Sequence, residues 1–170
     1  MSEAAAQLAL VFPGQGSQSV GMLAELSELH PGVKATFEEA SQGAGVDLWA
    51  LSQAGPEEQL NRTEYTQPAL LAAGVAVWRA WQASGGHAPT VLAGHSLGEY
   101  TALAAPDALC LRDGARLVRI RGPVMRDAAQ FYLDFLVEEP KHGWLVTAPS
   151  NSPENSFITA DGQTGRVCMG

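Results

Sequence analysis

The apolar positions along the chain predict two short strands separated by helices. Residues 8–12 form a continuous apolar run that ends at a Pro-Gly pair, and residues 91–93 form a second run that ends at Gly94. Such runs are typical of strands buried in a parallel sheet. The order strand, helices, strand, helix therefore predicts an α/β fold with parallel strands.

Apolar residues at helical spacing predict the helices near the N-terminus. A first helix is expected to present one apolar face, made of Met22, Leu23, Leu26 and Leu29. Pro31 is expected to open a second helix, because proline fits a first turn, and Gly43 and Gly45 to end it. Residues 46–62 are expected to form short helical pieces and loops.

Two longer helices are expected after these. Thr66 is expected to cap one of them, with Pro68 just inside its first turn and residues 84–86 as its end. Its buried face is expected to hold Leu71, Val75, Trp78 and Trp81. Residues 112–129 predict a further helix, whose inward side chains are expected to be Leu117, Ile120 and Val124.

Composition and charge exclude several classes of protein. The 170 residues are 46% hydrophobic and 16% charged, which permits a sizeable core, and the net charge of −8 argues against a general nucleic-acid binder. Five of the ten basic residues are arginines within residues 112–126. No apolar run approaches the ~20 residues of a membrane span, and no basic leader precedes the first strand, so a cytoplasmic protein is expected. Cys110 and Cys168 make neither a disulfide framework nor a metal site.

The strongest chemical signal is a nucleophile elbow. Residues 94–98 (Gly-His-Ser-Leu-Gly) match G-x-S-x-G between an expected strand and an expected helix. This context places Ser96 on a sharp turn at the carboxyl end of the sheet, with Gly94 and Gly98 leaving room for neighbouring backbone. A glycine-rich turn with an incidental serine is the alternative. His95 points away from its neighbour on such a turn, which favours a structural role over that of a base.

An oxyanion hole can be assembled from two backbone N–H groups. Leu97 starts the helix after the elbow, and Gln15 lies in the Gly-Gln-Gly loop after the first strand, at the same end of the sheet. Arg121 is a candidate partner for a substrate carboxylate, because a guanidinium binds a carboxylate through two parallel hydrogen bonds. From the pattern alone, Arg121 could equally be a solvated residue of the basic helix.

Taken together, these segments resemble the malonyl-CoA:acyl carrier protein transacylase family of fatty acid and polyketide synthesis. The resemblance covers residues ~7–129 and rests on four motifs in the family's order, at residues 11–18, 61–71, 94–100 and 116–122. It implies an incomplete α/β-hydrolase-like acyltransferase core and a ping-pong reaction through an acyl-serine. The implied substrates and partners are malonyl-CoA, a coenzyme A thioester, and acyl carrier protein, with no bound cofactor or metal.

The resemblance also assigns roles to individual residues. Ser96 corresponds to the nucleophile, and Gln15 and Leu97 to the oxyanion-hole donors. Arg121 corresponds to the arginine that pairs with the malonyl carboxylate, and Gln67 to a polar residue that lines the pocket. Gly94, His95 and Gly98 keep structural roles at the elbow.

The sequence departs from the family at several points. Pro123 follows Arg121-Gly122 inside an expected helix, where it can bend the helix. The family's catalytic histidine has no counterpart, and His142 lies in a segment unlike the family's. Residues that separate malonyl from methylmalonyl have no counterpart either, so the choice between these acyl groups stays open.

The tail from residue 130 resembles a different family. Residues ~131–157 are similar to a stretch of family 95 glycoside hydrolases, the α-L-fucosidases, in which Glu154 corresponds to the general acid. The resemblance implies an (α/α)₆ barrel, and a segment of about 35 residues is too short to form the core of such a barrel. Glu154 is therefore expected to be an exposed carboxylate. We predict that residues 1–129 are the first portion of an acyltransferase and that residues 130–170 are a foreign or divergent tail, not an independent domain.

Three functions remain compatible with the sequence. The first is a transacylase with impaired activity, since removing the histidine of a serine triad costs on the order of 10⁶ in kcat. The second is a non-catalytic fragment that binds acyl-CoA or carrier protein through its arginines. The third is a serine esterase. Because a parallel sheet needs more than two strands, exposed strand edges and dependence on a partner are also expected.

Overall fold

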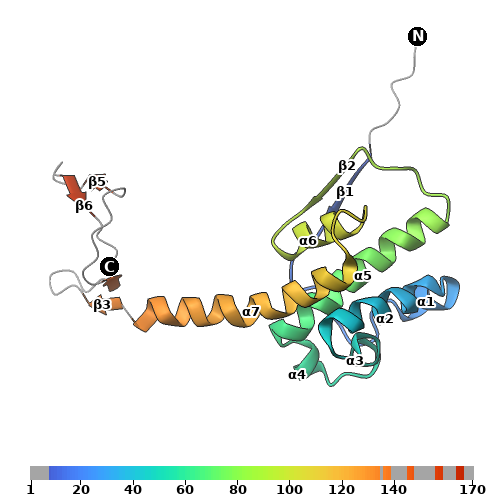
Figure 1. Ribbon diagram of the computed structural model, residues 1–170, viewed down its shortest axis with the longest axis horizontal. Helices are drawn as coiled ribbons and strands as arrows, with labels where there is room; N and C mark the ends of the chain where they lie inside the picture. Colours follow the sequence, from blue (N-terminus) through green and yellow to red (C-terminus); the bar gives the residue numbers. More distant parts are fainter. Residues whose placement is uncertain (1–7, 135, 139–144, 148–155, 159–163, 167–170) are drawn as a thin grey trace, which may run out of the picture. The chain divides into compact units, whose positions relative to one another are not determined.

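The computed structural model describes residues 8–134, 136–138, 145–147, 156–158 and 164–166. The chain divides into two compact units, Met1–Pro123 and Val124–Gly170. The first unit contains, in order, β1 (Ala9–Phe12), α1 (Ala24–Leu29), α2 (Gly32–Ala44), α3 (Leu48–Ala54), α4 (Glu57–Leu60), α5 (Thr63–Ala83), β2 (Val91–Gly94) and α6 (Leu97–Ala104) (Figure 1). Helix α7 (Leu111–Asp134) begins in this unit and continues past Pro123 into the second.

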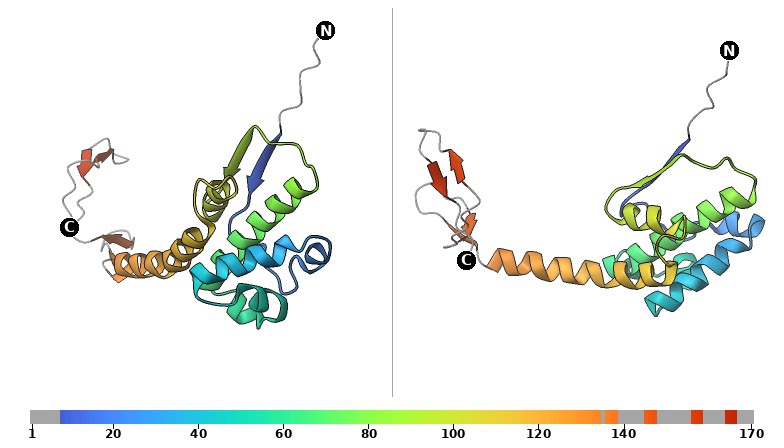
Figure 2. Two further views of the ribbon diagram at one scale, coloured as in Figure 1. Left: turned by 45° about the vertical axis from the view of Figure 1, so that its right-hand side comes forward. Right: turned by 45° about the horizontal axis from the view of Figure 1, so that its top comes forward.

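The two strands of the first unit form a parallel pair, as the sequence predicts. Their register runs from Ala9 opposite Val91 to Phe12 opposite Gly94. Helix α6 packs against both strands, which lie side by side in the views of Figure 2. The helices between the strands form the long crossover connection that parallel pairing requires. The α/β class is confirmed.

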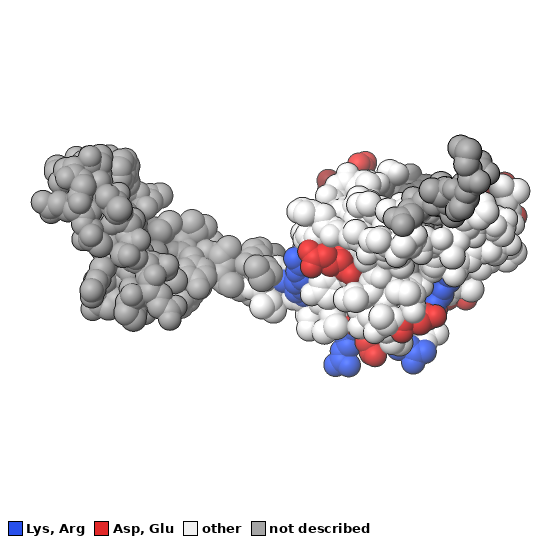
Figure 3. All heavy atoms as spheres, turned by 90° about the horizontal axis from the view of Figure 1, so that it is seen from above, with Lys and Arg blue, Asp and Glu red and all other residues white. Residues whose placement is uncertain are grey.

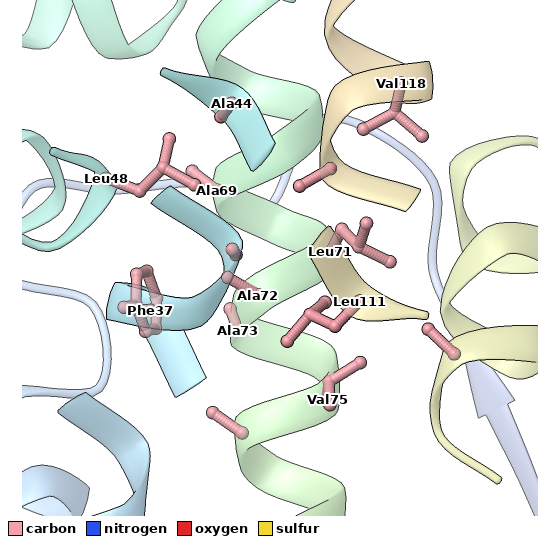
Figure 4. Packing of buried hydrophobic residues seen from close by; sticks show 14 of the residues in the cluster. Phe37, Ala44, Leu48, Ala69, Leu71, Ala72, Ala73, Val75, Leu111 and Val118 are labelled. Atoms are coloured by element: carbon pink, nitrogen blue, oxygen red, sulfur yellow. The ribbon is translucent and has the colours of Figure 1, made fainter. Parts of the chain in front are cut away.

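Helix α5 forms the centre of the core. It packs against α2, α3 and α4 on one side and against α6 on the other. Figure 4 shows Phe37 of α2 on one side of α5, and Leu71 and Val75 of α5 beside Leu111 of α7 on the other. All four side chains are buried, and Phe37 also meets the edge of Trp49, with ring centroids 5.2 Å apart. This packing holds α5, α6 and α7, the helices that carry the candidate site residues.

The inward face of α7 differs from the one expected. Leu117 and Ile120 are 45% and 54% exposed, and Val124 is exposed as well. Leu111, Ala115 and Val118 are the buried residues instead. Both sets have helical spacing, because this helix is apolar on two opposite sides. The buried set includes Ala115, whose small side chain gives a weaker hydrophobic signal than the bulky residues of the predicted face.

Helix α5 begins three residues before the expected cap. The Arg62 carbonyl accepts hydrogen bonds from the N–H groups of Tyr65 and Thr66, so Thr66 lies within the first turn of the helix. Thr66 is fully buried and its hydroxyl donates to the carbonyls of Leu60 and Arg62. The expected cap is therefore wrong. Pro68 is tolerated inside the helix, two residues after Thr66.

Two other expected inward residues, Leu29 and Trp81, are exposed. Helix α1 ends at Leu29, so this side chain lies at the end of the helix and not over the core. The indole N–H of Trp81 donates to the carbonyl of His87, which holds the ring near the surface. The expected end of α2 at Gly45 is confirmed, since Gly45 adopts a left-handed conformation there.

The second unit contains two short antiparallel pairs, for which the sequence analysis predicted no strands. Strand β3 (Leu136–Glu138) pairs with β4 (Leu145–Thr147), and β5 (Ser156–Ile158) pairs with β6 (Thr164–Arg166). The apolar run over residues 131–137 is divided between the end of α7 and β3. His142 and Glu154 lie outside the described residues, and whether the tail folds independently stays a prediction.

None of the helices is long and apolar enough to cross a membrane, in the part of the chain that was described. Within the same residues, no group of three or more His, Cys, Asp or Glu side chains could hold a metal ion.

Replacement of Asp47 by alanine is expected to lower the free energy of unfolding by about 1 kcal/mol. The Asp47 carboxylate caps α3 by accepting from the Ala50 N–H at 2.8 Å, and alanine leaves that donor without a side-chain acceptor. Denaturant titration measures the change. Asp47→Asn is the control, because asparagine caps as well as aspartate; an equal loss in both variants would contradict the capping account.

Candidate active site

Ser96 occupies the strained turn that the motif predicts. Strand β2 ends at Gly94 and α6 begins at Leu97, so two residues turn the chain from strand to helix. Ser96 has φ 56° and ψ −105°, in the left-handed half of backbone space that a non-glycine residue rarely adopts. The side chain of Glu99 accepts from the Ser96 N–H at 3.2 Å and holds the turn.

The two glycines of the elbow are required by close backbone contacts. A Cβ on Gly98 would fall on the carbonyl oxygen of Phe12 at the end of β1, and a Cβ on Gly94 would fall on the backbone of Gly98. No other residue type fits these positions without displacing backbone. The motif predicts that both glycines leave room for neighbouring backbone, and these close contacts agree with that prediction.

The loop after β1 lies against the elbow. The His95 N–H donates to the Phe12 carbonyl at 3.3 Å, and a Cβ on Gly14 would lie 3.3 Å from His95 Nδ1. The His95 side chain is thus beside the Gly-Gln-Gly loop and largely exposed. This position supports a structural role for His95 at the junction of the two segments.

Arg121 of α7 reaches the nucleophile directly. Its Nη2 donates to Ser96 Oγ at 3.1 Å, and its guanidinium carbon lies 5.5 Å from the centre of the Tyr100 ring. Its Nη1 is buried and has no hydrogen-bond partner among the residues that the structure describes. A buried guanidinium N–H without a partner is costly, so the position is suited to an anionic ligand beside Ser96.

Gln15 and Gln67 form a second polar group next to this pair. Gln67 Nε2 donates to Gln15 Oε1 at 3.4 Å, and Gln15 Nε2 donates to Thr63 Oγ1 at 3.3 Å. Gln67 is buried, and its Oε1 lacks a partner within the described chain. Gly122 allows α7 to lie close to Thr63, because a Cβ at position 122 would clash with the methyl group of Thr63. The polar group is therefore joined to the helix that carries Arg121.

Tyr100 and Thr63 are two site residues that the sequence analysis did not assign. Tyr100 is four residues after Ser96 on α6, so helical spacing places it one turn from the elbow. Thr63 is the first residue of α5, where its hydroxyl meets Gln15. The spacing could have identified Tyr100, whereas only the tertiary contact identifies Thr63.

The arginines near Arg121 have different surroundings. Arg112 and Arg116 are exposed, whereas Arg119 is half-buried with its guanidinium carbon 5.7 Å from the centre of the Tyr65 ring. On the face shown in Figure 3, acidic and basic side chains are few and interspersed. Of these arginines, Arg121 is the one for which the structure gives a hydrogen bond to Ser96.

The site has a nucleophile and an anion-binding group, and its serine has no base among the described residues. The hydrogen-bond partner of Ser96 Oγ is a guanidinium, which cannot accept a proton. Leu97 is the first residue of α6, and N–H groups in a first helical turn have no intrahelical acceptor, so Leu97 N–H can serve an oxyanion.

A strained serine at the carboxyl end of parallel strands, with an arginine beside it, defines an α/β protein with a nucleophile elbow. The chain belongs to the acyl transferase domain family, which matches residues 9–133. A second family, the glycosyl hydrolase family 95 catalytic domain, matches residues 111–170, in agreement with the resemblance of the tail. That match covers too little of the chain to assign it to the second family.

Similar proteins include curated and solved malonyl transacylases. The malonyl CoA-acyl carrier protein transacylase of Salmonella typhimurium is 58% identical over 122 residues, which are 72% of this chain and 40% of that protein. The crystal structure of the malonyl-CoA:acyl carrier protein transacylase FabD from Xanthomonas oryzae pv. oryzae is 73% identical, with a TM-score of 0.70, and the match covers 76% of this chain and 40% of that one.

A further solved relative is a malonyl-transacylase in complex with a type II polyketide synthase acyl-carrier protein. It is 57% identical, with a TM-score of 0.69, and the match covers 72% of this chain and 40% of that one. The chain thus spans about 40% of the length of these relatives.

Proposed function

We propose that this chain accepts a malonyl group from malonyl-CoA on Ser96 and passes it to the thiol of an acyl carrier protein. The observation that carries the proposal is Arg121, which donates to Ser96 Oγ and keeps a second, buried N–H without a partner in the described chain. A carboxylate that binds this guanidinium is held next to the nucleophile. Acyl groups with a free carboxylate, such as malonyl, meet this requirement.

The proposed chemistry follows from the geometry. Ser96 Oγ attacks the thioester carbon, and the carbonyl oxygen becomes an oxyanion that the N–H groups of Leu97 and Gln15 stabilise. The carbon–sulfur bond then breaks, and the departing thiolate of coenzyme A takes up a proton while the serine proton passes to solvent. In the second half of the reaction, the carrier protein's thiol attacks the acyl-serine carbon and gives its proton to solvent. The new carbon–sulfur bond forms, the serine carbon–oxygen bond breaks, and Ser96 Oγ takes up a proton. No resident cofactor enters these steps.

The rate of acylation is expected to be low. Arg121 cannot remove the serine proton, and the described residues place no histidine in hydrogen-bond contact with Ser96. Loss of the base from a serine triad typically costs on the order of 10⁶ in kcat. Transfer from malonyl-CoA should therefore be followed over hours, as a single acylation of the protein.

Replacement of Arg121 by alanine is expected to remove the preference for malonyl over acetyl. A hydrogen bond to a charged partner contributes about 1.5–3 kcal/mol, so the ratio of the malonyl and acetyl labelling rates should fall about 10- to 100-fold. Intact-protein mass spectrometry after incubation with each thioester measures both rates. Arg119→Ala is the control, because Arg119 lies on the same helix but faces Tyr65. An unchanged ratio in Arg121→Ala would contradict the assignment.

A second candidate function is binding without turnover. The observation that favours it is the guanidinium that donates to Ser96 Oγ, because it lowers the nucleophilicity of that oxygen and cannot accept its proton. In that case calorimetry would detect binding of malonyl-CoA, and Arg121→Ala would weaken that binding. Mass spectrometry would detect no acyl-serine. Hydrolysis of a p-nitrophenyl ester that depends on Ser96 would instead favour the esterase alternative.

A further inference from the structure

Side chains at the start of α5 and just before it bind the Gly-Gln-Gly loop. Thr63 Oγ1 accepts from Gln15 Nε2 at 3.3 Å, and Gln67 Nε2 donates to Gln15 Oε1 at 3.4 Å. Thr63 and Gln67 are four residues apart, so the Gln15 amide lies across one turn of α5. Before the helix, Asn61 Oδ1 accepts from Gln18 Nε2 at 2.9 Å. The loop after β1 is thus attached through two glutamines to one short stretch of chain.

These contacts reach the backbone of the loop. The Gly16 N–H donates to Gln18 Oε1 at 3.0 Å, so the Gln18 amide joins the loop backbone to Asn61. The neighbouring N–H of Gln15 is the candidate oxyanion donor of the loop. A donor of this kind is effective when it is already in place before the negative charge develops. The side chains that hold the loop are therefore suited to fix the position of the Gln15 N–H.

Thr63 also contacts the helix that carries Arg121. A Cβ on Gly122 would lie 2.5 Å from Thr63 Cγ2 and 3.2 Å from Thr63 Cβ. Gly122 directly follows Arg121, whose Nη2 donates to Ser96 Oγ. The half-buried Thr63 therefore lies between the two groups of the site, with its hydroxyl on the loop and its methyl group against α7.

We propose that Thr63 is a positioning residue for both groups of the acyl site. Its hydroxyl holds the Gln15 loop and so sets the position of the oxyanion donor. Its methyl group meets Gly122 and so sets how closely α7 brings Arg121 to Ser96. Loss of the hydroxyl lowers acylation by every thioester, whereas crowding at the methyl group changes the preference between charged and uncharged acyl groups. These effects on acylation rest on the proposed function, but the hold on the loop can be measured without it.

Thr63→Val tests the hydroxyl, because valine has nearly the same shape and no hydrogen-bonding group. Deuterium exchange of the Gly16 N–H, followed by NMR on the full chain, is expected to become about 2- to 10-fold faster, as for loss of one neutral hydrogen bond. Labelling by malonyl-CoA and by acetyl-CoA should each slow about 10-fold at an unchanged ratio, since both acyl groups need the oxyanion donor. Thr63→Ser, which keeps the hydroxyl, should restore the slow exchange. Thr90→Val is the matched control at an exposed residue before β2.

Gly122→Ala tests the methyl group. Its Cβ would displace α7 from Thr63 and move Arg121, so the ratio of malonyl to acetyl labelling should fall about 5-fold or more. The double variant Thr63→Ser/Gly122→Ala removes Cγ2, the atom nearest to the new Cβ, and is expected to recover the ratio. Two independent structural defects would instead add. Circular dichroism of each variant verifies that its fold is retained.

Three results would overturn the proposal. The first is unchanged exchange of the Gly16 N–H in Thr63→Val, and the second is slower labelling by only one of the two thioesters. The third is a ratio in Gly122→Ala that Thr63→Ser does not recover. If neither thioester labels the unmodified chain, the proposed function is contradicted, and the exchange of the Gly16 N–H alone decides the role of Thr63. Faster exchange in Thr63→Val then supports that role, and unchanged exchange refutes it.

Discussion

Replacement of Ser96 by alanine is expected to abolish the transfer of malonyl from malonyl-CoA to the protein. The elbow presents one hydroxyl beside Arg121, at 3.1 Å from its Nη2, so no second nucleophile shares that position in the described structure. Alanine removes the oxygen that would form the ester and leaves Arg121 in place. Intact-protein mass spectrometry should show one malonyl group on the unmodified chain and none on the variant.

The exposed Ser19 provides the matched control for this experiment. Ser19→Ala also removes one hydroxyl, but from a loop residue whose hydroxyl has no assigned role in the site. Its labelling should equal that of the unmodified chain. Equal labelling of Ser96→Ala and the unmodified chain would show that the malonyl group resides elsewhere, and it would remove the basis of the acyl-serine account.

Replacement of Gly98 by alanine is expected to destabilise the first unit by about 3 kcal/mol or more. The added Cβ would fall on the Phe12 carbonyl oxygen, which is backbone and cannot move without shifting β1 away from α6. Overpacking of this kind usually costs about 1–3 kcal/mol, and a clash with fixed backbone belongs at the upper end. Since whole domains are stable by only about 5–15 kcal/mol, the variant should unfold at much lower denaturant concentration.

Gly32→Ala is the control for Gly98→Ala. Gly32 is the first residue of α2, and a Cβ there meets no atom within 4 Å. Alanine should leave the stability unchanged or raise it by up to about 1 kcal/mol, because glycine is a poor helix former. Urea titration followed by circular dichroism compares the two variants. A Gly98→Ala protein as stable as Gly32→Ala would contradict the close approach of β1 and α6.

The elbow could be predicted from the sequence because its constraints are local. Gly94 and Gly98 are the residue types that a tight strand-to-helix turn demands, and the apolar run before Gly94 identifies the strand. The assignment of Arg121 required the family resemblance, because charge alone does not distinguish it from Arg116 or Arg119. Its hydrogen bond to Ser96 depends on how α7 packs against the unit, which periodicity does not reveal.

The errors in the helices have related physical causes. Helix α7 is apolar on two opposite sides, so spacing alone could not decide whether Val118 or Ile120 faces the core. Threonine commonly caps helices, so the sequence predicts the start of α5 at Thr66, yet here the hydroxyl of Thr66 donates to a carbonyl of the preceding turn. In both cases tertiary packing decided between two local patterns of similar strength.

The short strands of the second unit were not predicted from the sequence. Strands β3 to β6 have three residues each, which is too short for an alternating apolar pattern to be distinguished from a loop. The matched glycosyl hydrolase segment, residues 111–170, includes all of them. The boundary between the two units, at Pro123 and Val124, falls within α7.

Location of the acyl group by peptide mass spectrometry tests the central claim most directly. The unmodified chain is incubated with malonyl-CoA and digested with trypsin, which cuts after Arg79 and Arg112 and releases the peptide that contains Ser96 and Cys110. We expect fragmentation to place one malonyl group on Ser96. A malonyl group on Cys110, on a peptide outside residues 80–112, or on no peptide would contradict the account.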